Sequence, residues 1–182
     1  FLDSPMGISA TKTYSRYRHL FAAQLFEPRS DYPDLPNLFE TRTAEESMLI
    51  NEIESGAIII AGSGMCNGGR IRHHLKHNLW RNDSSVVFVG FAAHGTLARR
   101  IIDGAEMVRI YREDIPVRAR IYTIGGFSAH ADRDELLAWW RAGGAPRQTV
   151  LVHGDIEAMQ AFAHTLGDAK VRLPALHEVI DV

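Results

Sequence analysis

The fold class of this chain is decided by residues 122–132, which read YTIGGFSAHAD. This stretch begins as a β-rich run, passes through a loop of glycine, serine and histidine, and continues at helical spacing to Arg141. The same order of short strand, polar loop and helix recurs about five times along the sequence. Strands that alternate with helices are typical of an α/β fold, so we predict mainly parallel sheets flanked by helices.

The predicted elements follow this order along the whole chain. We expect strands at 57–61, 86–91, 107–111, 117–124, 149–152, 171–173 and 178–180, and helices at 9–25, 43–55, 70–80, 97–102, 133–141 and 156–166. Ser9 or Thr11 can cap the first helix, and Thr43 with Glu46 has the spacing of a capping box. In parallel sheets the ligand site gathers at the carboxyl ends of the strands, where the Gly, Ser and His clusters of this sequence fall.

The composition limits the classes of protein to consider. With 182 residues, 46% hydrophobic and 23% charged, the chain is long enough for one medium domain or two small lobes with a real core. Its longest apolar runs are far shorter than the roughly 20 residues of a membrane helix. The single cysteine, Cys66, excludes an internal disulfide framework and favours a reducing compartment, so we expect a cytoplasmic protein. A net charge of −2 means that any nucleic-acid site must be a local basic patch.

The first candidate site is the glycine-rich loop at 62–69, which lies between an apolar run and a basic helix. Its glycines permit a close approach of the backbone, and the N-terminus of the following helix offers unpaired N–H groups to an anion. We therefore predict that phosphate contacts this region through Ser63, Gly64, Gly68, Gly69 and Arg70. The alternative is a tight turn followed by a solvated basic helix, and the Gly-Lys-Ser/Thr of a Walker loop is absent.

The second candidate site is His130, which lies between a predicted strand and a predicted helix. Asp132 can cap the helix, and either Ser128 or Asp132 could orient the imidazole of His130. These three residues form the candidate catalytic group. The alternative is ordinary, because a lone histidine at a helix start more often caps or packs than catalyses.

The third candidate site is His153, which follows a buried strand and precedes Gly154 and Asp155. A histidine at a strand end, with an acid nearby, suits a metal ligand whose ring is held by a second carboxylate, here Asp155. The alternative is a strand-end histidine bonded to the backbone. Zinc needs three or four protein ligands, and no His-x-His-x-Asp-His or Cys-x-x-Cys sequence is present, so further ligands must come from elsewhere.

Taken together, several segments resemble the β-CASP branch of the metallo-β-lactamase superfamily. The two most specific are residues 127–132, FSAHAD, and 151–155, LVHGD, which match the family's motifs B and C. The others are residues 3–6 with Thr11, the loop 62–69, and Gly90-Phe91 with the run 95–97. On this resemblance, residues 1–114 are the carboxyl-terminal portion of a β-CASP domain and residues 115–182 that of a metallo-β-lactamase domain.

The resemblance implies a two-zinc ribonuclease. His153 would be a zinc ligand, and His130 would contact the scissile phosphate and act as general acid. A histidine at motif C favours RNA, because DNA-processing relatives tend to have valine there. Zinc would lower the pKa of the water that attacks phosphorus, and the cleaved RNA would carry 5′-phosphate and 3′-hydroxyl ends.

The sequence also departs from the family pattern. Asp155 stands where Glu is more common, and His94 stands where Glu is common before Gly-Thr. The amino-terminal metallo-β-lactamase portion with its zinc ligands is expected upstream, so the chain alone should be inactive or nearly so. A homodimer is left open. The rival interpretations are a non-catalytic RNA-binding or scaffold subunit of the same fold, and a general phosphoesterase.

Overall fold

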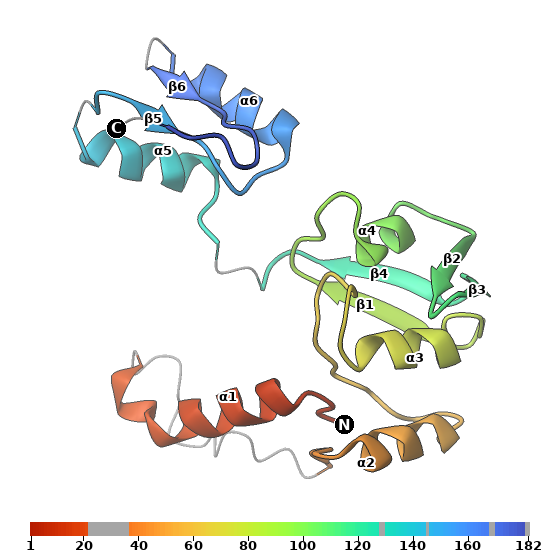
Figure 1. The fold of residues 1–182 in the computed structure, drawn as a ribbon. Helices are drawn as coiled ribbons and strands as arrows, with labels where there is room; N and C mark the ends of the chain where they lie inside the picture. The colour runs from red at the N-terminus through yellow and green to blue at the C-terminus, as the bar shows by residue number, and fades with distance from the viewer. Residues whose placement is uncertain (22–36, 128–129, 145, 168–169, 181–182) are drawn as a thin grey trace. The chain divides into compact units, whose positions relative to one another are not determined.

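The computed structural model describes residues 1–21, 37–127, 130–144, 146–167 and 170–180 (Figure 1). They fall into two compact units, Phe1–Gly126 and Phe127–Val182. The boundary between the two units therefore falls after β4 (Arg120–Ile124). The parallel partner of this strand, β1 (Ser85–Val89), lies earlier in the same unit. The assignment of residues 1–114 and 115–182 to two separate folds stays a prediction.

The first unit begins with helices and ends with strands. Its helical elements are α1 (Pro5–Arg16), η1 (Arg18–Leu20), α2 (Ala44–Leu49), η3 (Ile50–Glu52), α3 (Ile71–Asn78) and α4 (Leu97–Ile102). Its strands are β1, β2 (Met107–Ile110), β3 (Glu113–Pro116) and β4. The parallel pair runs from Ser85↔Arg120 to Val89↔Ile124, and β2 pairs antiparallel with β3. The chain passes from β1 through α4 and this hairpin to β4, which is the strand–helix–strand order of an α/β fold.

The core of the first unit lies between these strands and two helices. Leu75 and Leu79 of α3 and Ile101 of α4 are almost fully buried, and so are Val108 and Ile110 of β2. The spacing of Leu75 and Leu79 puts both on one face of α3, which packs into this core (Figure 1). Burying such a side chain contributes about 1.5–3 kcal/mol relative to leaving it exposed. The core therefore fixes α3, and with it the residue that precedes it, Arg70.

The second unit is a small two-strand sheet with two helices. It contains α5 (Arg133–Ala142), β5 (Thr149–Val150), α6 (Ile156–Thr165) and β6 (Val171–Arg172), with β5 parallel to β6 (Figure 1). Trp140 of α5 donates from Nε1 to the Thr149 hydroxyl of β5 at 2.9 Å, which ties the helix to the sheet.

The α/β class is confirmed, with several corrections at the level of elements. The first helix starts at Pro5 because Ser4, rather than Ser9 or Thr11, is its N-cap, and it ends at Arg16. Residues 57–61 form no strand, and their only ladder contact among the described residues is the bridge Leu2↔Ile60. The expected strand 178–180 is also absent. Both capping predictions, at Thr43 and at Asp132, are confirmed.

In the described part of the chain, none of the helices combines the length and apolar character needed to cross a membrane.

Candidate functional site

The His153 loop has an unusual backbone. His153 follows β5 and is exposed, and its φ of +64° lies in the left-handed region that non-glycine residues rarely adopt. The next residue, Gly154, has a structural reason to be glycine, because a Cβ there would lie 2.9 Å from Cγ of Met159 in α6. Asp155 is the N-cap residue of α6, but its side chain does not cap the helix. The loop thus holds the imidazole at the carboxyl end of β5, where it was predicted.

His130 lies immediately before a well-capped helix. Oδ1 of Asp132 accepts hydrogen bonds from the N–H groups of Asp134 and Glu135, both at 2.9 Å. The Glu135 carboxylate in turn accepts from the Asp132 N–H at 3.0 Å, which completes a capping box. Asp132, which lies two residues after the exposed His130, therefore fixes the start of α5. Ser128 lies outside the described residues, so its predicted role stays a prediction.

The glycine-rich loop is closed at its base and held along its length. A Cβ on Gly69, whose φ is +74°, would lie 2.9 Å from the Gly62 carbonyl oxygen, so the two ends of the loop touch. Within the loop, Cys66 N–H donates to the Ser63 carbonyl at 3.0 Å. Met65 accepts from Ala98 N–H at 3.2 Å through its carbonyl oxygen. Glycine at 69 is required by both the contact and the backbone conformation.

The loop carries backbone donors that the described part of the protein leaves unused. Ser63, Gly64 and Gly69 are exposed. Among the described residues, no acceptor takes a hydrogen bond from the N–H of Gly64 or Gly68. Exposed N–H groups next to a helix N-terminus suit an anion. This arrangement is consistent with the predicted phosphate contacts of Ser63, Gly64, Gly68 and Gly69, which stay predictions.

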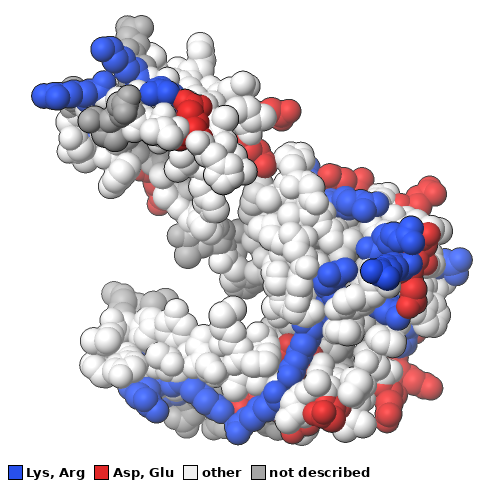
Figure 2. Space-filling model, viewed as in Figure 1, with Lys and Arg blue, Asp and Glu red and all other residues white. Residues whose placement is uncertain are grey.

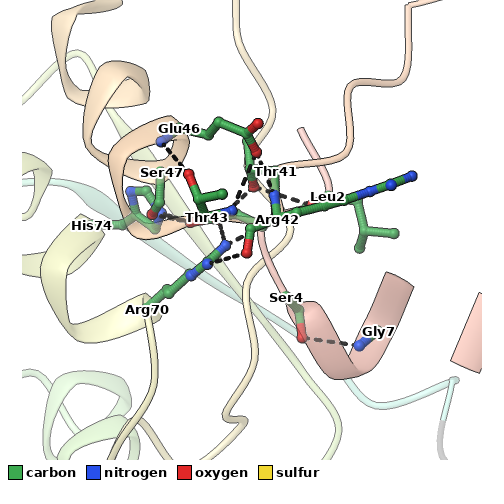
Figure 3. A network of polar contacts seen from close by, with 11 residues as sticks. Leu2, Ser4, Gly7, Thr41, Arg42, Thr43, Glu46, Ser47, Arg70 and His74 are labelled. Atoms are coloured by element: carbon green, nitrogen blue, oxygen red, sulfur yellow. Dashed lines mark hydrogen bonds and ion pairs between the residues drawn. The ribbon is translucent and has the colours of Figure 1, made fainter. Parts of the chain in front are cut away.

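Arg70 occupies a different place from the one expected of a phosphate ligand. Its Nη1 donates to Asp3 Oδ1 at 2.6 Å and to the Thr41 carbonyl at 2.9 Å, and its Nη2 donates to the Arg42 carbonyl at 3.0 Å (Figure 3). The guanidinium is thus directed into the protein. The basic surface expected on the following helix is further reduced, because Lys76 pairs with Glu113 at 2.5 Å. On the face shown in Figure 2, Lys and Arg of the first unit are interspersed with Asp and Glu.

The partner of Arg70 is the centre of a buried polar cluster, which we call the Asp3 cluster: Asp3, Thr41, Ser47, Arg70 and His74. The Asp3 side chain is fully buried. Besides Arg70, its Oδ1 accepts from the Thr41 hydroxyl at 2.5 Å, while Oδ2 accepts from the Ser47 hydroxyl at 2.7 Å and contacts His74 Nε2 at 2.6 Å. An ionised carboxylate only accepts, so His74 carries a proton on Nε2.

The cluster keeps Asp3 ionised. Burial alone raises the pKa of its carboxyl group, but the hydrogen bonds from Thr41, His74, Ser47 and Arg70 together outweigh it and lower the pKa to about 2. Removing one partner of such a pair leaves an uncompensated buried charge, which typically costs about 3–5 kcal/mol.

This pKa predicts an acid-sensitive region in the first unit. Because the folded pKa of Asp3 lies below its ordinary value of 3.8, the stabilisation is present above about pH 4 and is lost as the pH falls towards about 2. The loss should be about 2 kcal/mol. We expect the α3 amides to lose roughly 30-fold in hydrogen-exchange protection over this window, after correction for intrinsic rates. The exposed control Asp114→Asn should show the same loss, and Asp3→Asn should show none. Unchanged protection in the wild type would contradict the prediction.

Cys66 is a core residue. It is 2% exposed, and burial raises the pKa of its thiol to about 11.

The predicted site residues belong to two compact units. His130, Asp132, His153 and Asp155 belong to the second unit, and the loop 62–69 with Arg70 belongs to the first. We predict from their places at the carboxyl ends of the expected strands that His130, His153 and the loop face one cleft. In the described ranges, no group of three or more His, Cys, Asp and Glu side chains could hold a metal ion. The described residues by themselves therefore do not form a zinc centre.

Sequence reasoning missed the Asp3 cluster. The sequence pattern places Asp3 only in a segment that resembles the family, and it assigns no role to His74. The available signals were a carboxylate directly after the apolar pair Phe1-Leu2 and a basic pair, Arg70 and His74, at helical i,i+4 spacing.

Comparisons with family models and with known proteins point to the same family. The family model described as a Beta-Casp domain matches residues 1–101, and the model described as a Zn-dependent metallo-hydrolase RNA specificity domain matches residues 114–174. A ribonuclease of Thermus thermophilus is 40% identical over 169 residues, which cover 91% of this chain and 38% of that protein.

Two archaeal relatives come from Methanocaldococcus jannaschii. A transcription termination factor is 29% identical over 176 residues, covering 91% of this chain and 28% of the factor. An RNase J-like protein is 31% identical over 127 residues, covering 70% of this chain and 29% of that protein. The chain thus spans well under half the length of these relatives. The Beta-Casp model matches more than half of the chain, which therefore belongs to the β-CASP family of the metallo-β-lactamase superfamily.

Proposed function

We propose that the whole protein hydrolyses RNA phosphodiester bonds in a zinc-dependent reaction. In this proposal the chain supplies His153 as one zinc ligand and His130 as the residue that meets the scissile phosphate. Family membership supports it, as does the ribonuclease among the relatives. The second family model is described as a Zn-dependent metallo-hydrolase RNA specificity domain, which supports zinc as the metal and RNA as the substrate.

The observation that carries the proposal is the backbone of His153. A left-handed φ at a non-glycine residue costs of order 1–3 kcal/mol and persists where the surrounding structure enforces it, most often at functional sites. Here it presents an exposed imidazole at the carboxyl end of a parallel strand. A metal-binding role accounts for both the residue type and its conformation.

His130 is proposed to hold and transfer a proton at the scissile phosphate. It is exposed and stands directly before a helix whose first turn is fixed by the Asp132 capping box. A positioned general acid needs such a rigid support. Because Oδ1 of Asp132 takes both helix N–H groups, we assign Asp132 the task of fixing the chain next to His130.

Zinc would be shared between this chain and the rest of the protein. The chain offers one ligand on this proposal, His153, with Asp155 close along the chain as the carboxylate that orients it. The other ligands of the two proposed ions would come from an amino-terminal metallo-β-lactamase portion. When bound, zinc supplies a water of lowered pKa and neutralises charge at phosphorus. We accordingly propose that the isolated 182-residue chain has little or no activity.

The surface of the second unit supports such a partner portion. Neither α5 nor α6 has a buried residue. Large apolar side chains are instead exposed: Trp139 at 76%, Val152 at 66% and Ile156 at 55%. Large exposed apolar side chains are common at interaction surfaces. We propose that the metallo-β-lactamase portion covers it.

The experiment that tests the function uses the whole protein and two substrates. We expect zinc-dependent cleavage of a labelled RNA, abolished by a chelator and restored by zinc, with little turnover of bis(p-nitrophenyl) phosphate. Efficient turnover of the small diester without RNA cleavage would favour a general phosphoesterase. RNA binding without cleavage, in protein of full zinc content, would favour a non-catalytic RNA-binding subunit.

A further inference from the structure

The glycine-rich loop is joined at both ends to one buried residue. The Asp3 N–H donates to the Ile60 carbonyl at 2.8 Å, just before the loop begins. The Asp3 carboxylate binds Arg70, the first residue after the loop, at 2.6 Å. Asp3 therefore spans the base of the loop through its backbone on one side and its side chain on the other.

The neighbouring residue makes a second connection. The Ser4 hydroxyl accepts from the Gly7 N–H at 3.1 Å and so caps α1 (Figure 3). The same oxygen lies 3.3 Å from where a Cβ on Gly62 would stand. The start of α1 and the start of the loop are thus packed together, and a Cβ at position 62 would require Ser4 to shift by a few tenths of an ångström.

The helix after the loop is set by the same carboxylate. Arg70 and His74 lie one helical turn apart and contact different oxygens of Asp3, at 2.6 Å each (Figure 3). Two contacts one turn apart fix the rotation of α3 about its axis as well as its position. The N–H groups of Gly64 and Gly68, which precede this helix, inherit that orientation.

We propose that Asp3 and Arg70 are positioning residues for RNA cleavage, which hold the loop 62–69 in the geometry that contacts an RNA phosphate. Arg70 acts through Asp3 and does not bind phosphate itself. The three donor contacts of its guanidinium to Asp3, Thr41 and Arg42 carry this assignment. The inference rests on the proposed function, since it concerns the same substrate.

The test compares variants of the whole, zinc-loaded protein in RNA binding and single-turnover cleavage. Asp3→Asn and Arg70→Met should each lower the cleavage rate at saturating RNA by up to about 10²-fold, the effect of a misplacement near 1 Å. Because the two residues act as one unit, the double variant should be no worse than either single one. Arg70→Lys, which keeps the charge beside Asp3, should restore part of the rate.

The salt dependence of RNA affinity separates a positioning role from a direct one. Each phosphate contact made by a cation to single-stranded RNA contributes about 0.7 to the slope of log affinity against log salt. The slope for Arg70→Met should equal that of the wild type. The matched control is Arg42→Ala, which removes the same charge from a side chain 66% exposed and without contact to the Asp3 carboxylate. It should leave the saturating rate unchanged.

Two results would overturn the proposal. A slope lowered by about 0.7 in Arg70→Met, with Asp3→Asn unaffected in cleavage, would mean that Arg70 binds phosphate directly. Variants that cleave like the wild type would mean that the cluster does not position the loop. If Asp3→Asn fails to fold, Arg70→Lys decides, and a rate equal to that of the wild type in this folded variant counts against the proposal. Absence of cleavage by the wild type would instead contradict the proposed function.

Discussion

His130→Ala in the whole protein is expected to slow RNA cleavage by about 10²–10⁴-fold, because positioned proton transfer typically contributes that much. The zinc content should stay close to that of the wild type, since His130 is proposed to meet the phosphate and not the metal. Single-turnover cleavage of a labelled RNA and elemental analysis of the same preparations give both quantities.

The matched control for this variant is His164→Ala. His164 is an exposed histidine in the last turn of α6, in the same compact unit, and no function is assigned to it. It should leave rate and zinc content unchanged. If His130→Ala loses as much zinc as a variant of His153, the roles of the two histidines have been exchanged.

His153→Ala is expected to remove zinc as well as activity. Changing a group that merely hydrogen-bonds a metal ligand already costs about 10–100-fold in metal affinity. Loss of the ligand itself should therefore weaken zinc binding by more than about 100-fold, and cleavage should fall with it. The measurement is zinc affinity by competition with a chromophoric chelator.

The backbone of His153 allows a sharper version of this experiment. Asparagine tolerates the left-handed region better than most residues, and glycine adopts it without strain. His153→Asn and His153→Gly should therefore keep the loop at 153–155 in place while removing the imidazole. Zinc loss in both variants would assign the effect to the missing ligand. Wild-type zinc affinity in His153→Gly would contradict ligation by His153.

The sequence predicted well those features that depend on local chemistry. The capping boxes at Thr43 and Asp132 could be predicted because each cap needs only residues within one turn of it. The strand at β1 could be predicted because its β-branched run has a partner, β4. The apolar run at 57–61 is also rich in β-branched residues, but among the described residues its ladder pairing is limited to the bridge Leu2↔Ile60, so no strand forms there. Strand propensity without a pairing partner does not make a strand.

The features that depend on distant contacts could not be predicted. The partner of Arg70 is 67 residues away along the chain, so its basic character alone suggested a phosphate ligand. The same holds for Ser47 and Thr41, whose hydroxyls gain their role only from the buried carboxylate of Asp3. The strained backbone of His153 leaves no mark in composition or periodicity.

The most direct test of the proposed hydrolysis follows oxygen into the product. The whole, zinc-loaded protein would cleave a labelled RNA in water enriched in the heavy oxygen isotope, under single-turnover conditions, with mass spectrometry of both new ends. Attack of water on phosphorus predicts one heavy oxygen in a 5′-phosphate and none in the 3′-hydroxyl end. A 2′,3′-cyclic phosphate without heavy oxygen would instead show attack by the RNA's own 2′-hydroxyl, and would contradict zinc-dependent hydrolysis.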